Sequence, residues 1–154
     1  MEFGGRYRFD APRRAVWDAL NDAAVLKAVI PGCERIEWTS PTTLDLKVRV
    51  DLGLVRPAFS GELTLSDIHP AERYVLSGRG KGMLGLAHAS AEISLSDAEP
   101  GVTVLEFLAQ GHADNRILAI GRTLVGSSAQ RIIDGFFAAI GAEMGVSVTA
   151  LSRD

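Results

Sequence analysis

Residues 33–113 alternate between apolar and polar side chains over six successive segments, and this pattern constrains the fold more than any other. A side-chain period of two is typical of a β-strand with one buried face and one solvated face. Turn signals separate several of the segments, at Ser40-Pro41, His69-Pro70 and Glu99-Pro100-Gly101. Consecutive strands joined by short turns predict an antiparallel meander whose apolar face must be covered by another layer.

Three shorter elements precede the meander. Residues 2–10 alternate in the same way and predict one further strand, which makes seven strands in all. Pro12 suits the first turn of a short helix. Asn21-Asp22 ends that helix and can cap a second one, which Pro31-Gly32 stops. We expect the two short helices to close one end of the sheet.

A long amphipathic segment follows the meander. Apolar residues recur there at steps of three and four, which predicts a helix from about 116 to 144 that Asp114-Asn115 caps. At 1.5 Å per residue this helix is roughly 43 Å long, enough to cover the apolar face of the sheet. Gly145 is expected to stop it, and residues 146–154 to form a frayed tail. The chain is therefore an α+β protein with one domain over residues 1–145.

Small residues on both layers leave room for a cavity between sheet and helix. Glycines at 121, 126, 135 and 141 interrupt the helix, each at a cost of about 1 kcal/mol relative to alanine. Close packing of the backbones and space kept for a ligand explain them equally well. Such a cavity would be mainly apolar and would suit a hydrophobic small molecule. The residues expected to line it are Trp38, Leu46, Val48, Phe59, Leu63, Leu76, Gly78, Phe107, Leu124 and Ser128.

Ionisable residues form no recognisable catalytic or metal site in the sequence. No His, Cys, Asp and Glu cluster has the spacing of metal ligands, so neither a metal ion nor a cofactor is expected. The alternation places His88, His112 and Glu106 on the outer face of the sheet, and Asp67 at the end of a strand. The single cysteine, Cys33, is expected to be a buried structural thiol. No catalytic residue is therefore predicted.

The stretch Ser-Gly-Arg-Gly-Lys-Gly at residues 77–82 resembles a phosphate-binding loop only superficially. No helix follows it, whereas phosphate loops lead into one. A bulged strand, or a close approach of the C-terminal helix, is the favoured interpretation. A flexible basic rim beside the mouth of a cavity is the alternative.

Charge and hydropathy exclude several classes of protein. The 154-residue chain has a formal net charge of −3, which argues against a nucleic-acid partner. No apolar run approaches the ~20 residues of a membrane span, and the first residues lack the apolar core of a signal peptide. We therefore expect a cytoplasmic protein.

Several motifs resemble one known family over roughly residues 2–144. They are Ala15-Val16-Trp17-Asp18-Ala19-Leu20-Asn21-Asp22, the stretch Val25 to Glu34 with its Ile30-Pro31-Gly32-Cys33-Glu34 end, Phe59 to Asp67, Ser77 to Gly82, and Asp134-Gly135-Phe136-Phe137. This set resembles the G-subunit family of carbon monoxide dehydrogenase, which belongs to the START-related helix-grip superfamily.

The resemblance implies a helix-grip fold, in which a curved seven-stranded sheet wraps around the C-terminal helix. It also implies a non-catalytic accessory protein that binds a lipid- or quinone-like molecule and serves a molybdenum hydroxylase of the carbon monoxide dehydrogenase type. Association with the inner face of the cytoplasmic membrane would be peripheral at most. The oligomeric state stays open, a homodimer included.

Two other functions are compatible with the same sequence. Helix-grip relatives include polyketide cyclases and dehydratases, which place acid–base residues inside the cavity. The chain would instead be a protein–protein interaction module if side chains fill the cavity. The orientation of Asp67, Glu106, His88 and His112 distinguishes the first alternative, and the volume of the cavity the second.

Overall fold

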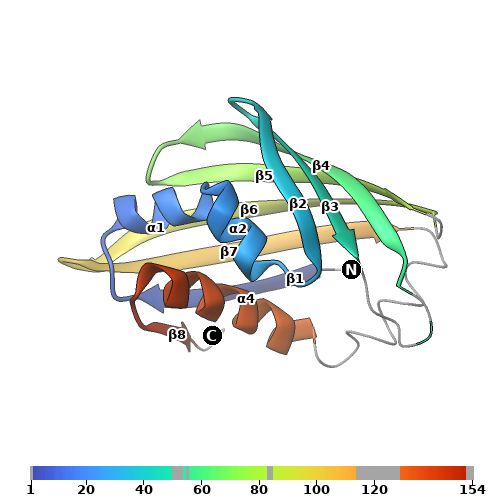
Figure 1. Ribbon diagram of the computed structural model, residues 1–154. Coiled ribbons are helices and arrows are strands. Elements are labelled where there is room, and N and C mark those ends of the chain that lie inside the picture. The colour runs from blue at the N-terminus through green and yellow to red at the C-terminus, as the bar shows by residue number, and fades with distance from the viewer. Residues whose placement is uncertain (1, 50–53, 55, 83–84, 114–128, 152–154) are drawn as a thin grey trace.

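A single antiparallel sheet forms most of the protein (Figure 1). The computed structural model describes residues 2–49, 54, 56–82, 85–113 and 129–151. The sheet has eight strands in the order β2-β3-β4-β5-β6-β7-β1-β8. They are β1 (Glu2–Phe9), β2 (Cys33–Ser40), β3 (Thr43–Arg49), β4 (Ala58–His69), β5 (Arg73–Gly82), β6 (Gly85–Glu99), β7 (Val102–Ala113) and β8 (Val148–Leu151).

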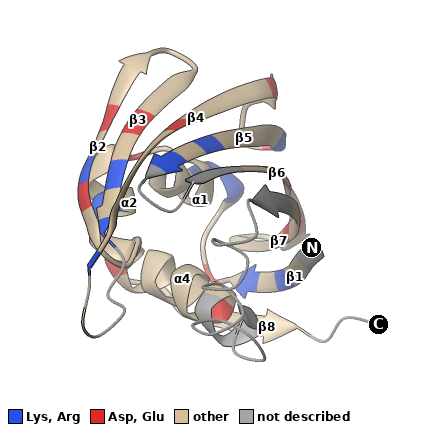
Figure 2. Cartoon of the chain, turned by 90° about the vertical axis from the view of Figure 1, so that its right-hand side faces the viewer, with Lys and Arg blue, Asp and Glu red and all other residues tan. Residues whose placement is uncertain are grey.

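The six strands of the predicted meander are confirmed as β2 to β7, each paired with the next. β1 pairs with β7, so the first strand of the chain lies beside the last strand of the meander. Figure 2 shows the sheet curving from β2 around to β8. The curvature follows from the right-handed twist of strands, which accumulates over a sheet of this size.

The expected total of seven strands and the expected frayed tail are wrong, because residues 148–151 form β8 on the free edge of β1. The pairing begins where the amide of Asp10 donates to the carbonyl of Ser147 over 3.1 Å. A sheet edge presents unpaired backbone groups that a neighbouring segment can satisfy. Four residues of weak alternation give no such signal until the position of β1 is known.

Two short helices, α1 (Arg13–Leu20) and α2 (Ala23–Val29), connect β1 to β2. The predicted cap of the second helix is confirmed, because the Asp22 carboxylate accepts hydrogen bonds from the amides of Ala24 (2.9 Å) and Val25 (3.4 Å). Pro12 differs slightly from expectation, since it lies at the N-cap of α1 rather than inside its first turn. Gly32 ends the pair of helices with a positive φ of 75°.

The C-terminal helix α4 (Ala129–Met144) closes the open side of the curved sheet (Figure 2). Gly145 ends it with a φ of 74°, and the amide of Val146 donates to the carbonyl of Gly141, as expected for a glycine stop. The predicted start near residue 116, its Asp114-Asn115 cap and the glycines at 121 and 126 lie outside the described residues.

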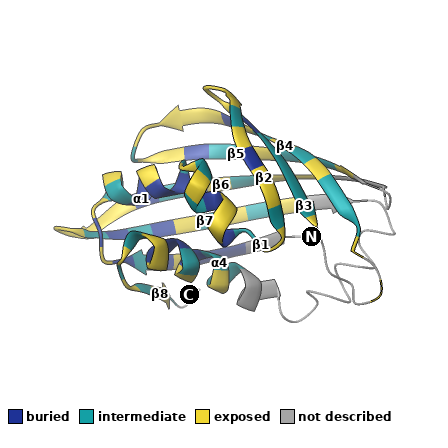
Figure 3. Ribbon diagram, viewed as in Figure 1, coloured by how far each residue is buried: buried dark blue, intermediate teal, exposed yellow. Residues whose placement is uncertain are grey.

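The core occupies the end of the sheet that α1, α2 and α4 cover (Figure 3). Tyr7, Phe9 and Leu105 are at most 1% exposed there, and Ile140 of α4 packs against the same cluster. A smaller cluster of Leu26, Ile36 and Leu44 lies beneath α2. The architecture is thus an α+β helix-grip, with its three described helices gathered at one end of the sheet.

Candidate functional site

An apolar pocket of about 310 Å³ lies between the sheet and the three helices. Five strands and all three described helices contribute to its wall. The lining residues are Leu20, Asn21, Leu26, Ile30, Pro31, Leu44, Leu63, Leu65, Tyr74, Leu76, Ala91, Ile93, Phe107, Ile133, Phe136 and Phe137. Alternation within each strand explains the choice of strand residues, since all of them lie on the face that the helices cover.

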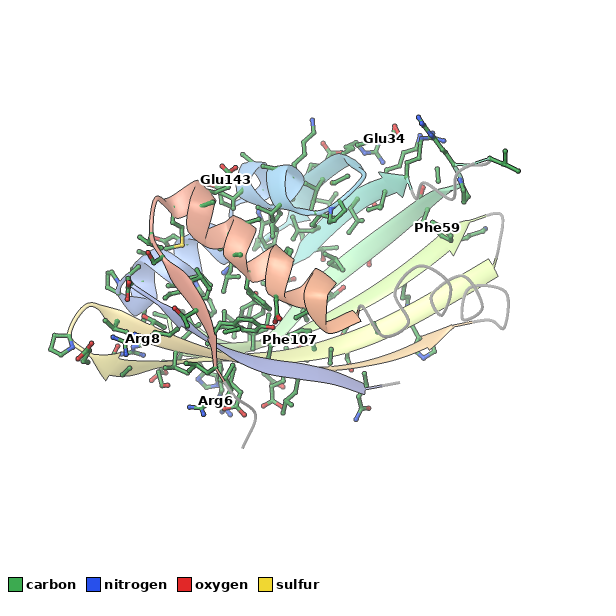
Figure 4. The ribbon with its side chains drawn as sticks, turned by 90° about the horizontal axis from the view of Figure 1, so that it is seen from below. Arg6, Arg8, Glu34, Phe59, Phe107 and Glu143 are labelled. Carbon is green, nitrogen blue, oxygen red and sulfur yellow. The ribbon has the colours of Figure 1, made fainter. Side chains whose placement is uncertain are left out.

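Aromatic contacts fix the part of the wall that α4 contributes. The Phe137 ring lies edge to face with Phe107 of β7, at a centroid distance of 5.7 Å, and with Phe136 at 5.1 Å. Figure 4 shows Phe107 beneath α4. Edge-to-face pairs at this distance contribute about 0.5–1.5 kcal/mol beyond the area they bury. The helix is therefore held against β7 by rings that also border the pocket.

Trp38 of β2 connects the sheet to the segment between the short helices α1 and α2. Its indole Nε1 donates to the carbonyl of Asn21 over 3.2 Å, and the Asn21 side-chain amide donates to the carbonyl of Trp17 over 2.9 Å. Trp38 is half-buried between the two core clusters. These bonds position the loop between α1 and α2, which forms one end of the pocket.

Three of the ten residues expected to line a cavity border this pocket, namely Leu63, Leu76 and Phe107. Leu46 is half-buried beside the smaller cluster. Val48 and Phe59 pair across β3 and β4, and Figure 4 shows Phe59 far from Phe107. Leu124 and Ser128 lie outside the described residues.

The short helices contribute to the wall in a way that the sequence pattern does not indicate. Leu20, Leu26 and Ile30 are expected only to close one end of the sheet, whereas they form part of the pocket wall. Tyr74 and Ile93 lie on the same alternating face as the expected lining residues, so the alternation already indicated that both point inward. The alternation could not show at which position along each strand the helices pack.

A second hollow, of about 870 Å³, lies on the opposite face of the sheet. Its polar residues alternate with the strand residues of the apolar pocket, and most of them are exposed. Gly61, Gly78, Gly80 and Ala89 also border it, although they share the alternation of the apolar face. The residues that border the hollow are Asp45, Ser60, Gly61, Glu62, Ser77, Gly78, Arg79, Gly80, Lys81, His88, Ala89, Ser90 and Gln110. Gly78, expected in the apolar cavity, borders this hollow, while a Cβ at Gly78 would meet the side chain of Leu63, which lines the apolar pocket.

The glycine-rich stretch is a regular strand. Residues 78–82 of β5 pair in unbroken register with β4 and with β6, so the expected bulge is wrong. A Cβ on Gly61 would come within 2.9 Å of the Arg79 carbonyl oxygen, so close approach of strands explains at least this glycine. Arg79 and Lys81 are exposed on the outer face, away from the apolar pocket.

The ionisable residues considered for acid–base chemistry lie apart from the apolar pocket. Asp67, with a φ of 49°, and Glu106 are exposed, and His88 borders the outer hollow. The side chain of His112 lies outside the described part of the chain. Cys33 is half-buried rather than buried, and its thiol lies 3.5 Å from the carbonyl oxygen of Arg35.

Tyr74 is the one ionisable group in the wall of the pocket, as far as the structure describes it. It is 4% exposed, and its ring meets the Trp17 ring edge-on at 5.2 Å. Burial raises the pKa of the Tyr74 phenol above its ordinary value of 10.0, because the charged phenolate loses solvation. The hydroxyl therefore stays protonated at neutral pH and can donate a hydrogen bond.

Solved structures share the fold at low sequence identity. A conserved protein from Geobacillus kaustophilus has a TM-score of 0.82 and 22% identity, with 96% of this chain and 99% of that chain covered. A START superfamily protein from Mycobacterium smegmatis has a TM-score of 0.69 and 10% identity over 94% and 97%. The Zhui aromatase/cyclase from Streptomyces sp. R1128 has a TM-score of 0.69 and 16% identity over 94% and 93%. These likenesses show the fold alone.

Comparison of sequences gives one family. The model of the carbon monoxide dehydrogenase G-subunit family (CoxG) matches residues 5–145. The match runs from the middle of β1 to just past the end of α4 and includes every described residue that lines the apolar pocket. No curated protein matches the chain.

Proposed function

Since the chain belongs to the CoxG family of carbon monoxide dehydrogenase, we propose that it is a non-catalytic binding protein for an apolar small molecule. The ligand, lipid- or quinone-like, would occupy the pocket between the sheet and α4. The protein would hold it in the service of a molybdenum hydroxylase of the carbon monoxide dehydrogenase type.

The observation that supports this proposal is the apolar pocket itself. Its volume of about 310 Å³ lies at the lower end of the range of small-molecule sites, ~300–1,000 Å³. Among the described residues of its wall there is no Asp, Glu, His, Lys or Arg. A wall of this kind favours burial of an apolar molecule and offers no acid–base pair for chemistry on it.

The interaction-module alternative needs the space between sheet and helix to be filled by side chains. A pocket of about 310 Å³ favours the ligand-binding function over that alternative. The cyclase alternative needs an acid or base in the pocket, and the described wall supplies none of the residues considered for it. The likeness to an aromatase/cyclase, at 16% identity, supports a shared fold and nothing about the reaction.

The direct test is binding of an apolar ligand to a protein whose pocket has been filled. Ala91 is half-buried on β6 and borders the pocket, whereas Ala98 lies on the same strand and is exposed. We expect wild-type protein and Ala98→Phe to bind 2-methyl-1,4-naphthoquinone with equal affinity, and Ala91→Phe to bind it at least 10-fold more weakly. Quenching of the two tryptophans, Trp17 and Trp38, provides the signal.

Extraction of the purified protein followed by mass spectrometry would identify a co-purified ligand. A wild-type protein that carries no apolar molecule and binds none of a panel of quinones and lipids would contradict the proposal. Equal binding by Ala91→Phe and Ala98→Phe would place the ligand elsewhere.

Service to a hydroxylase and the place in the cell are further parts of the proposal. We expect the tagged protein to recover molybdenum hydroxylase subunits, and Ala91→Phe to recover them equally while losing the ligand.

We also propose that the protein is cytoplasmic and at most peripherally bound to the inner face of the membrane. Salt-sensitive co-sedimentation with membranes would test this location. No helix among the described residues has both the length and the apolar character that crossing a membrane requires.

A further inference from the structure

Tyr74 presents the wall of the apolar pocket with a hydroxyl group that has no partner among the described residues. None of them accepts a hydrogen bond from it, although the residue is only 4% exposed. Every fully buried side-chain oxygen or nitrogen in the described part of the chain has a partner. The Tyr74 oxygen is therefore not fully enclosed, and because Tyr74 lines the apolar pocket, we infer that its hydroxyl is accessible from there.

The Tyr74 ring is held in place by its neighbours. It meets the Trp17 ring of α1 edge-on, with centroids 5.2 Å apart and planes at 85°. Its backbone pairs with Ile93 of β6, another residue of the wall. A ring fixed on two sides positions its hydroxyl before a ligand arrives, which lowers the entropic cost of the hydrogen bond.

The other polar side chain of the described wall, Asn21, already donates one hydrogen bond within the protein. The Asn21 amide group donates to the Trp17 carbonyl, and the Asn21 backbone carbonyl accepts from the Trp38 indole. No cation lines the described wall, so a carboxylate or phosphate inside the pocket would lie unpaired. An unpaired buried charge is strongly unfavourable. The Tyr74 hydroxyl is thus the donor in the described wall that no described contact occupies, and it suits a neutral molecule.

The size of the pocket limits the ring system that fits. An apolar cavity of ~150 Å³ holds one benzene ring. A pocket of about 310 Å³ therefore has room for two fused rings, or for one ring with a short chain.

We propose that the pocket selects a neutral, ring-sized apolar molecule that carries a carbonyl-type oxygen, and that Tyr74 donates a hydrogen bond to that oxygen. This inference rests on the proposed function and adds the chemical class of the ligand. Tyr74 would act as a specificity-determining residue, because a buried donor left without its acceptor favours ligands that supply one.

The test uses three probes of equal ring size: 2-acetylnaphthalene, which has a carbonyl, 2-ethylnaphthalene, which lacks it, and 2-naphthoate, which is charged. Tyr74→Phe removes the hydroxyl and keeps the ring. Tyr7→Phe is the matched control, since Tyr7 is the chain's other tyrosine, is buried and does not border the pocket. Calorimetric titration or probe fluorescence gives each affinity.

We expect Tyr74→Phe to weaken binding of 2-acetylnaphthalene by about 3- to 10-fold, the range of a single hydrogen bond. Its affinity for 2-ethylnaphthalene should be unchanged or slightly higher. Tyr7→Phe should change both affinities by the same factor. Wild-type protein should bind 2-naphthoate at least 10-fold more weakly than the ketone, because the pocket offers its charge no partner.

The outcomes separate this inference from the proposed function. Tight binding of all probes, with no selective loss in Tyr74→Phe, would overturn the role of Tyr74 and leave an apolar binding site. Failure of the neutral probes to bind at all would overturn both. An infrared spectrum of bound 2-acetylnaphthalene provides a reading without any variant: a carbonyl stretch at the frequency found in hydrocarbon solvent would also overturn the inference.

Discussion

The hydroxyl of Tyr7 on β1 donates a 2.6 Å hydrogen bond to Oδ1 of Asp134 on α4, across 127 residues of sequence. The Tyr7 ring also lies 4.5 Å from the Phe137 ring, with the two planes tilted by 33°. Tyr7 is 1% exposed, whereas Asp134 is half-buried, so the hydrogen bond between them is partly shielded from water. Because Phe137 borders the apolar pocket, this pair positions the helix that covers the pocket.

Removal of the Tyr7 hydroxyl should therefore loosen α4. We expect Tyr7→Phe to lower the free energy of unfolding by about 1–2 kcal/mol, as for a hydrogen bond to a part-buried carboxylate. For a chain of this length that corresponds to a fall in Tm of roughly 3–6 °C. Asp134→Asn keeps an acceptor oxygen for the Tyr7 hydroxyl, so it should lower the free energy of unfolding by less than Tyr7→Phe does. An unchanged Tm in Tyr7→Phe would show that ring packing alone seats the helix.

The two glycines of α4 differ in their surroundings. Replacing each with alanine should therefore change the free energy of unfolding in opposite directions. A Cβ at Gly135 meets no atom within 4 Å, so Gly135→Ala should stabilise the protein by about 0.5–1 kcal/mol through helix propensity. A Cβ at Gly141 would collide with the Val148 side chain of β8 and lie 3.1 Å from the Val146 carbonyl oxygen. Gly141→Ala should destabilise by about 1–3 kcal/mol.

Urea unfolding of the two variants measures both values. The comparison is internally controlled, because the same substitution is made twice in one helix. A stabilising Gly141→Ala would mean that β8 can move away from α4 at little cost.

A buried hydroxyl connects β7 to the start of α1. Thr103 is 0% exposed, and its Oγ1 donates to the carbonyl of Ala11 over 2.7 Å. Thr103→Val keeps the shape of the side chain but leaves the Ala11 carbonyl without this donor. We expect the free energy of unfolding to fall by about 1–3 kcal/mol. Thr103→Ser keeps the bond and should recover part of that loss. Equal stability of the two variants, measured by thermal unfolding, would contradict this assignment.

The sheet could be predicted from the sequence because alternation is a local property. Leu44 and Leu46, or Leu63 and Leu65, identify the inner face without any knowledge of the fold, and Asp22 marks a helix start by its own chemistry. Long-range pairing is different. Nothing near Val148 indicates that β1 has a free edge, so β8 could not be predicted.

The same limit applies to the pocket. Leu63 and Phe59 occupy equivalent positions in the alternation of β4, yet only Leu63 borders the pocket. The difference arises from where α2 and α4 meet the sheet, which depends on contacts such as Tyr7 with Asp134. Contacts of this kind join residues more than 100 positions apart, and a single sequence does not reveal them.

The buried phenol of Tyr74 should make stability fall in alkaline solution. Burial raises its pKa above the ordinary 10.0, so the folded protein keeps a proton that the unfolded chain releases. Above about pH 10 the free energy of unfolding should therefore decrease by up to ~1.4 kcal/mol per pH unit from this group, and the contribution is fully present below pH 10. Tyr74→Phe has no such proton, so its unfolding free energy should decline less steeply between pH 9 and pH 11. Urea titrations at several pH values compare the two slopes, and equal slopes would mean that the phenol is solvated in the folded protein.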